Sequence, residues 1–247
     1  MEITVLGAGS AYPRPGGACS GFFLATGSAR VWIDAGNGTF SRLQQVTDHR
    51  ELDALILTHG HADHVADVLP FMYAIGFDPD LEAFTVPVYS PGDVGPGLGW
   101  PLGGTSLEMF RKVFDFRPIA KAFEIRDVSF EPFRTFHPAE TYGLRMRQGE
   151  RTIVYTSDTA LYPELAAACQ DADLLICEAT YTDAVKAEPG VHLWAREAGE
   201  VAAKAAVKRL VLTHVWPTLS LDDAVAEASA TFGGPVEAAV EGKTYSV

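Results

Sequence analysis

The chain of 247 residues and 26.6 kDa is longer than most single domains, but a layered α/β protein of this size can form around one continuous core. Hydrophobic residues make up 47% of the chain and charged residues 21%, which excludes a disordered or coiled-coil protein and predicts a single domain over residues 1–247. The formal net charge of −13 argues against a long nucleic acid lying across the surface.

Short strands separated by turns are expected in the first fifty residues. The apolar runs at 3–6, 21–25 and 30–34 are bounded by glycine, proline and serine, which favours meandering strands. From residue 51 onward, apolar runs that end in polar residues indicate buried strands, at 54–59, 152–158, 173–178 and 209–214.

Helices are expected between and after these strands. The clearest lie at 193–208 and at 221–232, where Ser220 is placed to cap the start and Gly233 to end the helix. Residues 76–118 differ, because glycines and prolines interrupt any periodicity. We expect this segment to form an irregular excursion near the active site, either an ordinary surface loop or a lid that shapes the entrance.

The strongest signal for chemistry follows the run at 54–57. The segment Thr58-His-Gly-His-Ala-Asp-His64 places three imidazoles and one carboxylate within six residues, and both are ligand types that Zn²⁺ favours at catalytic sites. His59 and His61 can point the same way from an extended turn, whereas Asp63 and His64, which open the following helix, can turn toward a second ion. One cation would not use all four comfortably, so the spacing indicates two.

Three further candidate ligands stand at the ends of predicted strands. They are His137 after 133–136, Asp158 after 153–157 and His214 after 210–213. Each alone has an ordinary explanation, because a histidine after a strand is often structural and an aspartate in Ser-Asp-Thr can cap a turn. Together with the first motif they offer enough ligands for a metal site of this size.

In this order, these residues resemble the metallo-β-lactamase superfamily of binuclear metallohydrolases, over nearly the whole chain. The opening segments 6–13, 20–21 and 34–38 and the segment 191–198 are similar to the ribonuclease Z-like branch, and the chain looks closest to short bacterial members without the tRNA-gripping arm. The resemblance implies an α/β fold that is a four-layer αββα sandwich, with two mixed sheets face to face and the metals at one edge.

The resemblance also implies how the seven candidate ligands divide between two divalent cations. One ion would be held by His59, His61 and His137 and the other by Asp63, His64 and His214, with Asp158 bridging both. Zn²⁺ is the expected ion, and Mn²⁺ or Fe²⁺ are alternatives. Two such ions can share a hydroxide nucleophile and together clamp the oxygens of a phosphodiester.

Two residues are assigned catalytic roles by the resemblance. Asp63 would orient the nucleophile as well as ligate, and His192 would donate to a phosphate oxygen or leaving group, a role that suits a near-neutral pKa. The family's usual His-Ser-Thr is here His192-Leu-Trp194, and a structural histidine at the start of a helix is the alternative. Asp34 and Glu178 either accept hydrogen bonds from ligating histidines or only shape turns.

From these features we predict a zinc-dependent phosphodiesterase that uses a metal-bridging hydroxide on a small or short substrate such as a cyclic nucleotide. Twenty residues separate His137 from Asp158, which leaves no room for the arm that ribonuclease Z inserts between the corresponding ligands. The acidic composition also disfavours a tRNA substrate, although Arg134, Arg145, Arg147 and Arg151 could form a local basic face. Alternatives are a ribonuclease Z-like nuclease of RNA or tRNA 3′ ends, a thioester or lactone hydrolase, and a metal-binding regulatory module without turnover.

The remaining expectations concern location and assembly. Cys19, Cys169 and Cys177 form no CxxC pair, which fits neither a disulfide framework nor a zinc ribbon and favours a reducing cytoplasm. No basic leader precedes the first strand-like run, and no apolar segment approaches the ~18 residues that a membrane span needs. We therefore expect a cytoplasmic protein with no membrane partner, and the resemblance implies a homodimer.

Overall fold

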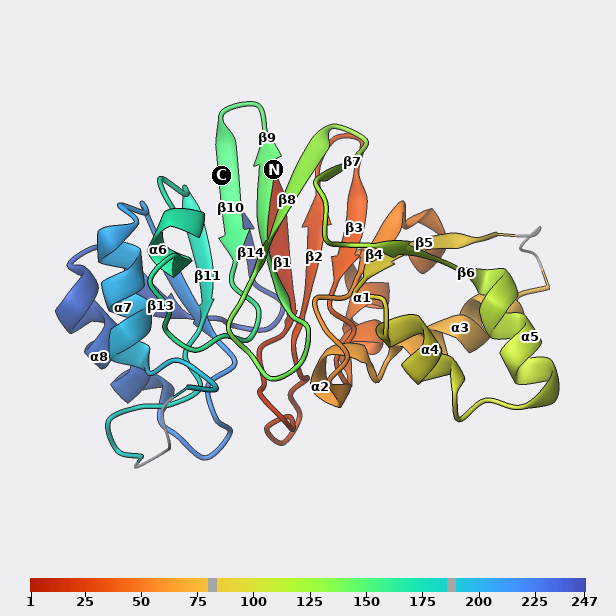
Figure 1. Cartoon of the computed structure of the whole chain (residues 1–247), viewed down its shortest axis with the longest axis horizontal. Coiled ribbons are helices and arrows are strands. Elements are labelled where there is room, and N and C mark those ends of the chain that lie inside the picture. The colour runs from red at the N-terminus through yellow and green to blue at the C-terminus, as the bar shows by residue number, and fades with distance from the viewer. Residues whose placement is uncertain (80–83, 186–189) are drawn as a thin grey trace.

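Two seven-stranded mixed sheets lie at the centre of the molecule (Figure 1). The structure is a computed structural model that describes residues 1–79, 84–185 and 190–247. In spatial order the first sheet contains β14 (Thr244–Ser246), β1 (Glu2–Gly7), β2 (Gly21–Ala25), β3 (Arg30–Ile33), β4 (Ala54–Ile56), β5 (Val86–Ser90) and β6 (Phe114–Pro118). Neighbours are antiparallel from β14 to β3 and parallel from β3 to β6, so the expected N-terminal meander is confirmed.

The second sheet is also part antiparallel and part parallel. Its strands, in spatial order, are β13 (Val236–Ala238), β12 (Leu210–Thr213), β11 (Leu174–Glu178), β10 (Arg151–Tyr155), β9 (Tyr142–Gln148), β8 (Val128–Arg134) and β7 (Phe123–Ile125). Neighbours are antiparallel from β7 to β10 and parallel from β10 to β13. The parallel strands carry the apolar runs that the sequence predicts as buried strands.

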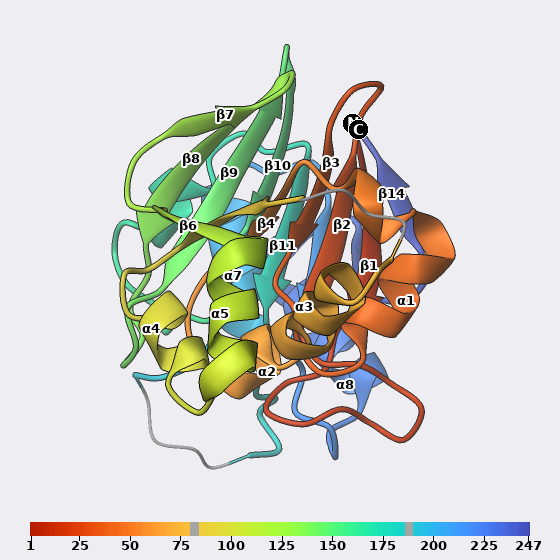
Figure 2. The ribbon, with the colours of Figure 1, turned by 90° about the vertical axis from the view of Figure 1, so that its right-hand side faces the viewer.

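Helices cover the outer face of each sheet. Over the first sheet lie α1 (Thr39–Val46), α2 (Ala62–Val65), α3 (Val68–Gly76), α4 (Val94–Gly99) and α5 (Gly104–Val113), and a short 3-10 helix, η1 (His49–Glu51), follows α1 (Figure 2). Over the second sheet lie α6 (Leu165–Ala168), α7 (Ala195–Lys204) and α8 (Leu221–Phe232). The result is the four-layer αββα sandwich that we expected.

Strand alternation explains why the apolar runs are continuous. In β4, Ala54 and Ile56 face the core between the sheets, whereas Leu55 faces the helices. In β11, Leu174 and Ile176 face the inner core and Leu175 faces α7 and α8. Because both faces of these strands are covered, every position of the run is apolar.

The expectation of an irregular excursion over 76–118 is wrong for most of that segment. It contains β5, α4, α5 and β6, and β6 forms the edge of the first sheet. The glycines and prolines concentrate between 91 and 104, whereas the flanking stretches alternate as strands, and Pro118 is tolerated because it ends an edge strand. Within the segment, Val94 of α4 does lie beside the first motif, since a Cβ on Gly60 would stand 3.5 Å from it.

Helix ends follow local capping. The prediction for 221–232 is confirmed: the Ser220 hydroxyl accepts from Asp223 N, and Gly233 ends the helix with a φ of 73°. The helix expected at 193–208 is shorter. Trp194 occupies the N-cap position, where its N–H donates to the Glu197 carboxylate, and Ala206 takes a left-handed conformation after the helix end. No helix in the described part of the chain is long and apolar enough to cross a membrane.

Candidate metal centre

The seven predicted ligands meet at one edge of the sandwich. His59 follows β4, the residues from His61 to His64 open α2, and the other three follow β8, β10 and β12, at His137, Asp158 and His214. Polar side chains that follow neighbouring strands at one edge of an α/β sheet commonly form ligand sites. Two groups of candidate ligand atoms form here, each with its atoms within 4.8 Å of one another.

The first group joins three histidines to Asp158. Nε2 of His137 lies 3.2 Å from Nδ1 of His61. Oδ2 of Asp158 lies 3.6 Å from Nε2 of His59 and 4.0 Å from Nε2 of His137. These atoms surround a space that one cation with nitrogen and oxygen ligands would fill.

The second group uses the other oxygen of the same carboxylate. Oδ1 of Asp158 lies 3.3 Å from Nε2 of His64 and 3.5 Å from Nε2 of His214. Oδ2 of Asp63 lies 3.2 Å from Nε2 of His214 and 3.8 Å from Nε2 of His64. Asp158 therefore presents one oxygen to each group, which is the arrangement of a carboxylate that bridges two ions.

Hydrogen bonds behind the first motif fix the tautomers of two histidines. Oδ2 of Asp34 accepts from the Thr58 hydroxyl at 2.9 Å, so this hydroxyl accepts in turn from Nδ1 of His59 at 3.2 Å. Nδ1 of His64 donates to the same Asp34 oxygen at 2.8 Å. Both imidazoles therefore engage their partners through Nδ1 and direct Nε2 toward the site, where a bound metal would take its lone pair.

The other side of the site uses the same principle. Nδ1 of His137 donates to the Val191 carbonyl oxygen at 3.2 Å. The Thr180 hydroxyl donates to Oε2 of Glu178 at 2.7 Å and so accepts from Nδ1 of His214 at 2.9 Å. These two histidines also direct Nε2 toward the centre.

Buried polar atoms test whether these residues suit a metal. Among the described residues, Nε2 of His59, Nε2 of His64 and Oδ1 of Asp158 are fully buried and have no hydrogen-bond partner. Buried polar atoms are normally paired, and a divalent cation would satisfy all three. The histidine and aspartate clusters are therefore suited to binding divalent metal ions.

The electrostatics favour the same conclusion. Burial lowers the pKa of His59 and of His137, which keeps both imidazoles neutral and able to ligate. Burial would also lower the pKa of His64, but Asp158 and Asp34 outweigh it and raise that pKa well above the usual value. Burial would raise the pKa of Asp158, yet His214 and His64 hold it well below the usual carboxyl range. The same negative potential that favours a charged imidazole would attract a divalent cation.

His192 lies beside the two groups. Its ring centroid is 5.3 Å from that of His214 and 5.2 Å from that of His137, and its Nδ1 donates to Oε1 of Glu178 at 2.8 Å. Burial would lower the pKa of His192, but Glu178 outweighs it and raises the pKa to about 9. The Glu178 carboxylate thus favours the charged form of the ring more strongly than the near-neutral pKa that we expected from the sequence.

Glu178 organises this side of the site. It is fully buried, and besides His192 and Thr180 it accepts from the backbone N–H groups of Thr159 and Leu193. A third cluster formed by Glu178, His192 and His214 also has its atoms within 4.8 Å. Because the oxygens of Glu178 are already engaged by these donors, this cluster is better explained as a positioning network than as a third ion site.

Several residues of the site were not predicted from the sequence. Tyr155 donates from its hydroxyl to Asp34 at 3.0 Å, Ser157 donates to the Thr58 hydroxyl at 2.7 Å, and Thr180 links His214 to Glu178. Strand alternation places Tyr155 on the inner face of β10, but its partner belongs to the other sheet, so no local signal identifies it.

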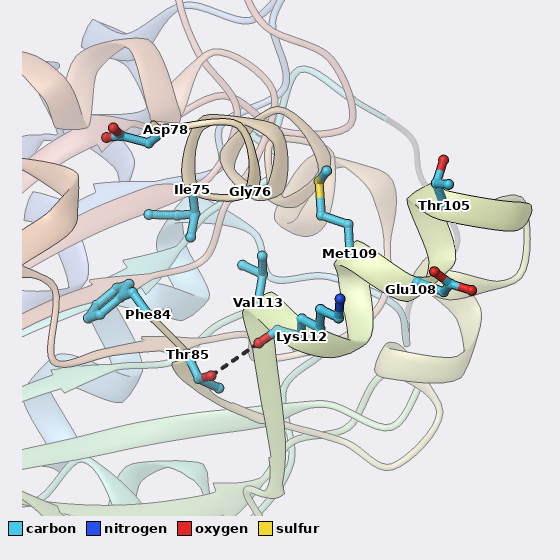
Figure 3. A pocket seen from close by; sticks show the side chains of 10 residues that line it. All are labelled: Ile75, Gly76, Asp78, Phe84, Thr85, Thr105, Glu108, Met109, Lys112 and Val113. Atoms are coloured by element: carbon cyan, nitrogen blue, oxygen red, sulfur yellow. Dashed lines mark hydrogen bonds between the residues drawn. The ribbon is translucent and has the colours of Figure 1, made fainter. Parts of the chain in front are cut away.

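The cavity in Figure 3 is separate from this centre. Its volume is about 410 Å³, it lies between α3 and α5, and its lining includes Ile75, Met109 and Lys112. None of the seven candidate ligands lines it, and the helices that form it lie over the first sheet. Helices α3 and α5 therefore build the flank of the molecule, whereas Val94 of α4 lies beside Gly60 of the first motif.

Comparisons with known proteins agree with the geometry. A family model described as "Beta-lactamase superfamily domain" matches residues 29–215. The chain is 33% identical to the uncharacterized protein Rv1339 of Mycobacterium tuberculosis over 254 residues, which cover 100% of this chain and 92% of that protein. It is 27% identical to the ribonuclease Z of Myxococcus xanthus, with 100% of this chain and 98% of that protein covered.

A solved structure shows the same architecture. The metallo-beta-lactamase fold protein YhfI from Bacillus subtilis is similar with a TM-score of 0.88 at 27% identity, over 99% of both chains. The family match spans most of the present chain, including His59 through His214. The protein therefore belongs to the metallo-β-lactamase superfamily, among whose members are metallo-hydrolases and ribonuclease Z.

Proposed function

We propose that this protein is a zinc-dependent phosphodiesterase that acts on a small or short phosphodiester such as a cyclic nucleotide. The observation that carries the proposal is the placement of Asp158 between two histidine groups, with the ring of His192, hydrogen-bonded to Glu178, alongside. A phosphodiester is an anion, and hydrolysis needs both charge neutralisation at its oxygens and a proton donor for the leaving group.

Each side chain would have a defined task. One ion would be held by His59, His61 and His137 and the other by Asp63, His64 and His214, with Asp158 shared. When bound, two divalent cations lower the pKa of a water and neutralise the charge on phosphate oxygens. Asp63 would orient the attacking water as a hydrogen-bond acceptor, and His192, held through Nδ1 by Glu178, would donate from Nε2 to a phosphate oxygen or to the leaving group.

The short segment between His137 and Asp158 favours a small substrate. The residues between them form the end of one loop and the hairpin of β9 and β10, so no long arm projects from this point. The alignment with the ribonuclease Z of Myxococcus xanthus runs over 302 positions although this chain has 247 residues, so that relative carries residues that this chain lacks.

Three of the four arginines that could have formed an RNA footprint are engaged by the protein itself. Arg134 donates to the Thr141 carbonyl oxygen, Arg145 donates to the Gln170 carbonyl oxygen, and Arg147 forms an ion pair with Glu131 at 3.6 Å. A tRNA would need unoccupied cations along its backbone. This observation favours a small diester over a ribonuclease Z-like substrate.

The test is a parallel assay of the zinc-loaded protein against bis(p-nitrophenyl) phosphate, adenosine 3′,5′-cyclic monophosphate, a precursor tRNA and a thioester, with metal content measured on the same sample. Hydrolysis of the first two substrates, abolished by chelation, is expected. Turnover of only the thioester or only the precursor tRNA would overturn the substrate assignment.

Matched histidine variants separate the roles. His61→Ala is expected to lower both metal content and rate, whereas His192→Ala is expected to lower the rate ~10²-fold or more while two ions stay bound. His49 is the one histidine of the seven outside the site, so His49→Gln is the control and should keep wild-type activity. Unchanged turnover in His192→Ala would contradict the proton-donor role, and absence of any turnover in a fully loaded wild type would favour a regulatory module.

A further inference from the structure

Two exposed apolar side chains directly precede residues of the candidate metal centre. Phe136 precedes His137 and is 59% exposed, and Val191 precedes His192 and is 37% exposed. Single exposed hydrophobic residues are ordinary on a protein surface. A pair that flanks two neighbouring site residues is not explained by the fold alone.

Hydrogen bonds join the segments that carry Phe136 and Val191 to each other and to the loop after Asp158. The Ala160 N–H donates to the Phe136 carbonyl oxygen at 2.8 Å, and the Phe136 N–H donates to the Thr159 hydroxyl at 3.2 Å. The Val191 carbonyl oxygen accepts from Nδ1 of His137 at 3.2 Å. The segments that carry the apolar side chains are therefore joined to one another and to the ligands, which makes their position a fixed property of the site.

We infer that Phe136 and Val191 form an apolar lip that binds the planar base or aryl group of the substrate beside the ions. The inference rests on the proposed function and names the class of diester: one that carries a nucleobase or another aromatic ester group. A phosphate held at the two ions places its ester groups next to the residues that flank His137 and His192, and an aromatic ring there would cover apolar surface and stack on Phe136.

The structure offers a matched control on another surface. Phe77, at the end of α3, is 69% exposed and stacks on Tyr73 with a centroid distance of 5.5 Å. Both residues belong to the flank that carries the cavity of Figure 3, away from the seven candidate ligands. Removal of the Phe77 ring deletes a similar exposed aromatic surface without touching the lip.

The test compares adenosine 5′-monophosphate with ribose 5-phosphate, which share the phosphate and the sugar and differ only in the base. Binding to the zinc-loaded protein is measured by calorimetry. Wild type and Phe77→Ala are expected to bind the nucleotide about 10-fold more tightly, the preference that one stacked base provides. Phe136→Ala should reduce the preference to less than about 3-fold, and Phe136→Tyr, which keeps the ring, should retain it.

The outcomes separate this inference from the proposed function. An unchanged preference in Phe136→Ala, with two ions bound, would overturn the lip, as would a wild type that binds both compounds equally. Failure of the wild type to hydrolyse any phosphodiester would instead overturn the proposed function, whatever the binding ratio. If the lip serves a second copy of the chain, sedimentation would show Phe136→Ala dissociating with its base preference intact, which also overturns the inference.

Discussion

Replacement of Asp34 by asparagine tests how the protein prepares His64 for a metal. Asp34 is fully buried, and its Oδ1 accepts from the Thr58 N–H at 2.8 Å. Its Oδ2 accepts from the Thr58 hydroxyl, from Nδ1 of His64 and from the Tyr155 hydroxyl, at 2.9, 2.8 and 3.0 Å. An amide nitrogen at the Oδ2 position would face three donors. The opposite orientation of the amide would face the Thr58 N–H, which cannot rotate.

In Asp34→Asn, His64 can avoid two donors facing each other by changing its tautomer. Nδ1 would accept from the amide, and the proton would move to Nε2, the atom that faces Asp158. Return to the ligating tautomer costs about 1.5–3 kcal/mol, the contribution of one hydrogen bond to a charged group. This corresponds to roughly 10- to 150-fold weaker binding, close to the ~10–100-fold that loss of such partners costs in metal sites.

The measurement is a zinc titration in competition with a chromophoric chelator, with circular dichroism as a check on folding. The ion of the His64 group is expected to weaken first, because His59 senses Asp34 only through Thr58. Asp67→Asn is the matched control, since Asp67 is a buried aspartate of the same region that accepts from the Phe40 N–H at 2.8 Å. Two ions bound to folded Asp34→Asn with wild-type affinity would refute the tautomer reasoning, and equal weakening in both variants would indicate a general loss of structure.

Three further substitutions test the fold around the site. Ala206→Gly should raise the free energy of unfolding by about 0.5–1 kcal/mol in a urea titration, because Ala206 ends α7 with a φ of 51°; an unchanged midpoint would contradict this. Gly36→Ala should lower the free energy of unfolding by about 1–3 kcal/mol and reduce metal content, because a Cβ at this position overlaps the Asp63 carbonyl oxygen. Gly60→Ala is the control, and its stability and metal content should stay near those of the wild type. Burial lowers the pKa of His49, so below pH ~6.5 the unfolded chain takes up the proton more readily than the folded protein, and stability decreases as the pH is lowered. In thermal melts, the Tm of His49→Leu should therefore decrease less between pH 7.5 and pH 5.5 than that of the wild type. Parallel curves of Tm against pH would argue against this role.

The candidate ligands could be predicted because their signal is local. Four of them stand in one motif, and the others each follow a run of apolar residues that reads as a buried strand. Since the polar residues after such strands meet at one edge of the sheet, their convergence follows from the strand pattern. The same pattern, with α8 and its caps, indicates buried strands covered by helices. The four-layer arrangement came from the resemblance, and the order of the strands within each sheet was not predicted.

The supporting network could not be predicted because its contacts cross the sandwich. Tyr155 and Asp34 are 121 positions apart and belong to different sheets, so their pairing depends on how the two sheets stack. The raised pKa of His192 likewise depends on Glu178, which a family motif does not reveal as a charge partner. In the segment 76–118, turn residues dominated the composition and hid β5 and β6, which pair with each other and, through β5, with β4.

The backbone at the strand ends shows why the site and the fold depend on each other. Asp34, Ser157 and His214 directly follow or lie just beyond β3, β10 and β12, and all three have left-handed φ values, of 55°, 53° and 61°. Non-glycine residues in this conformation cost ~1–2 kcal/mol each and persist where surrounding contacts hold them. Here the contacts are the hydrogen bonds that also set the tautomers: the Asp34 carboxylate holds His64, and the Ser157 hydroxyl donates to Thr58. The His214 N–H donates to the Ala8 carbonyl oxygen. These hydrogen bonds therefore hold the left-handed turns at the strand ends, and these turns direct the neighbouring candidate ligands toward the site.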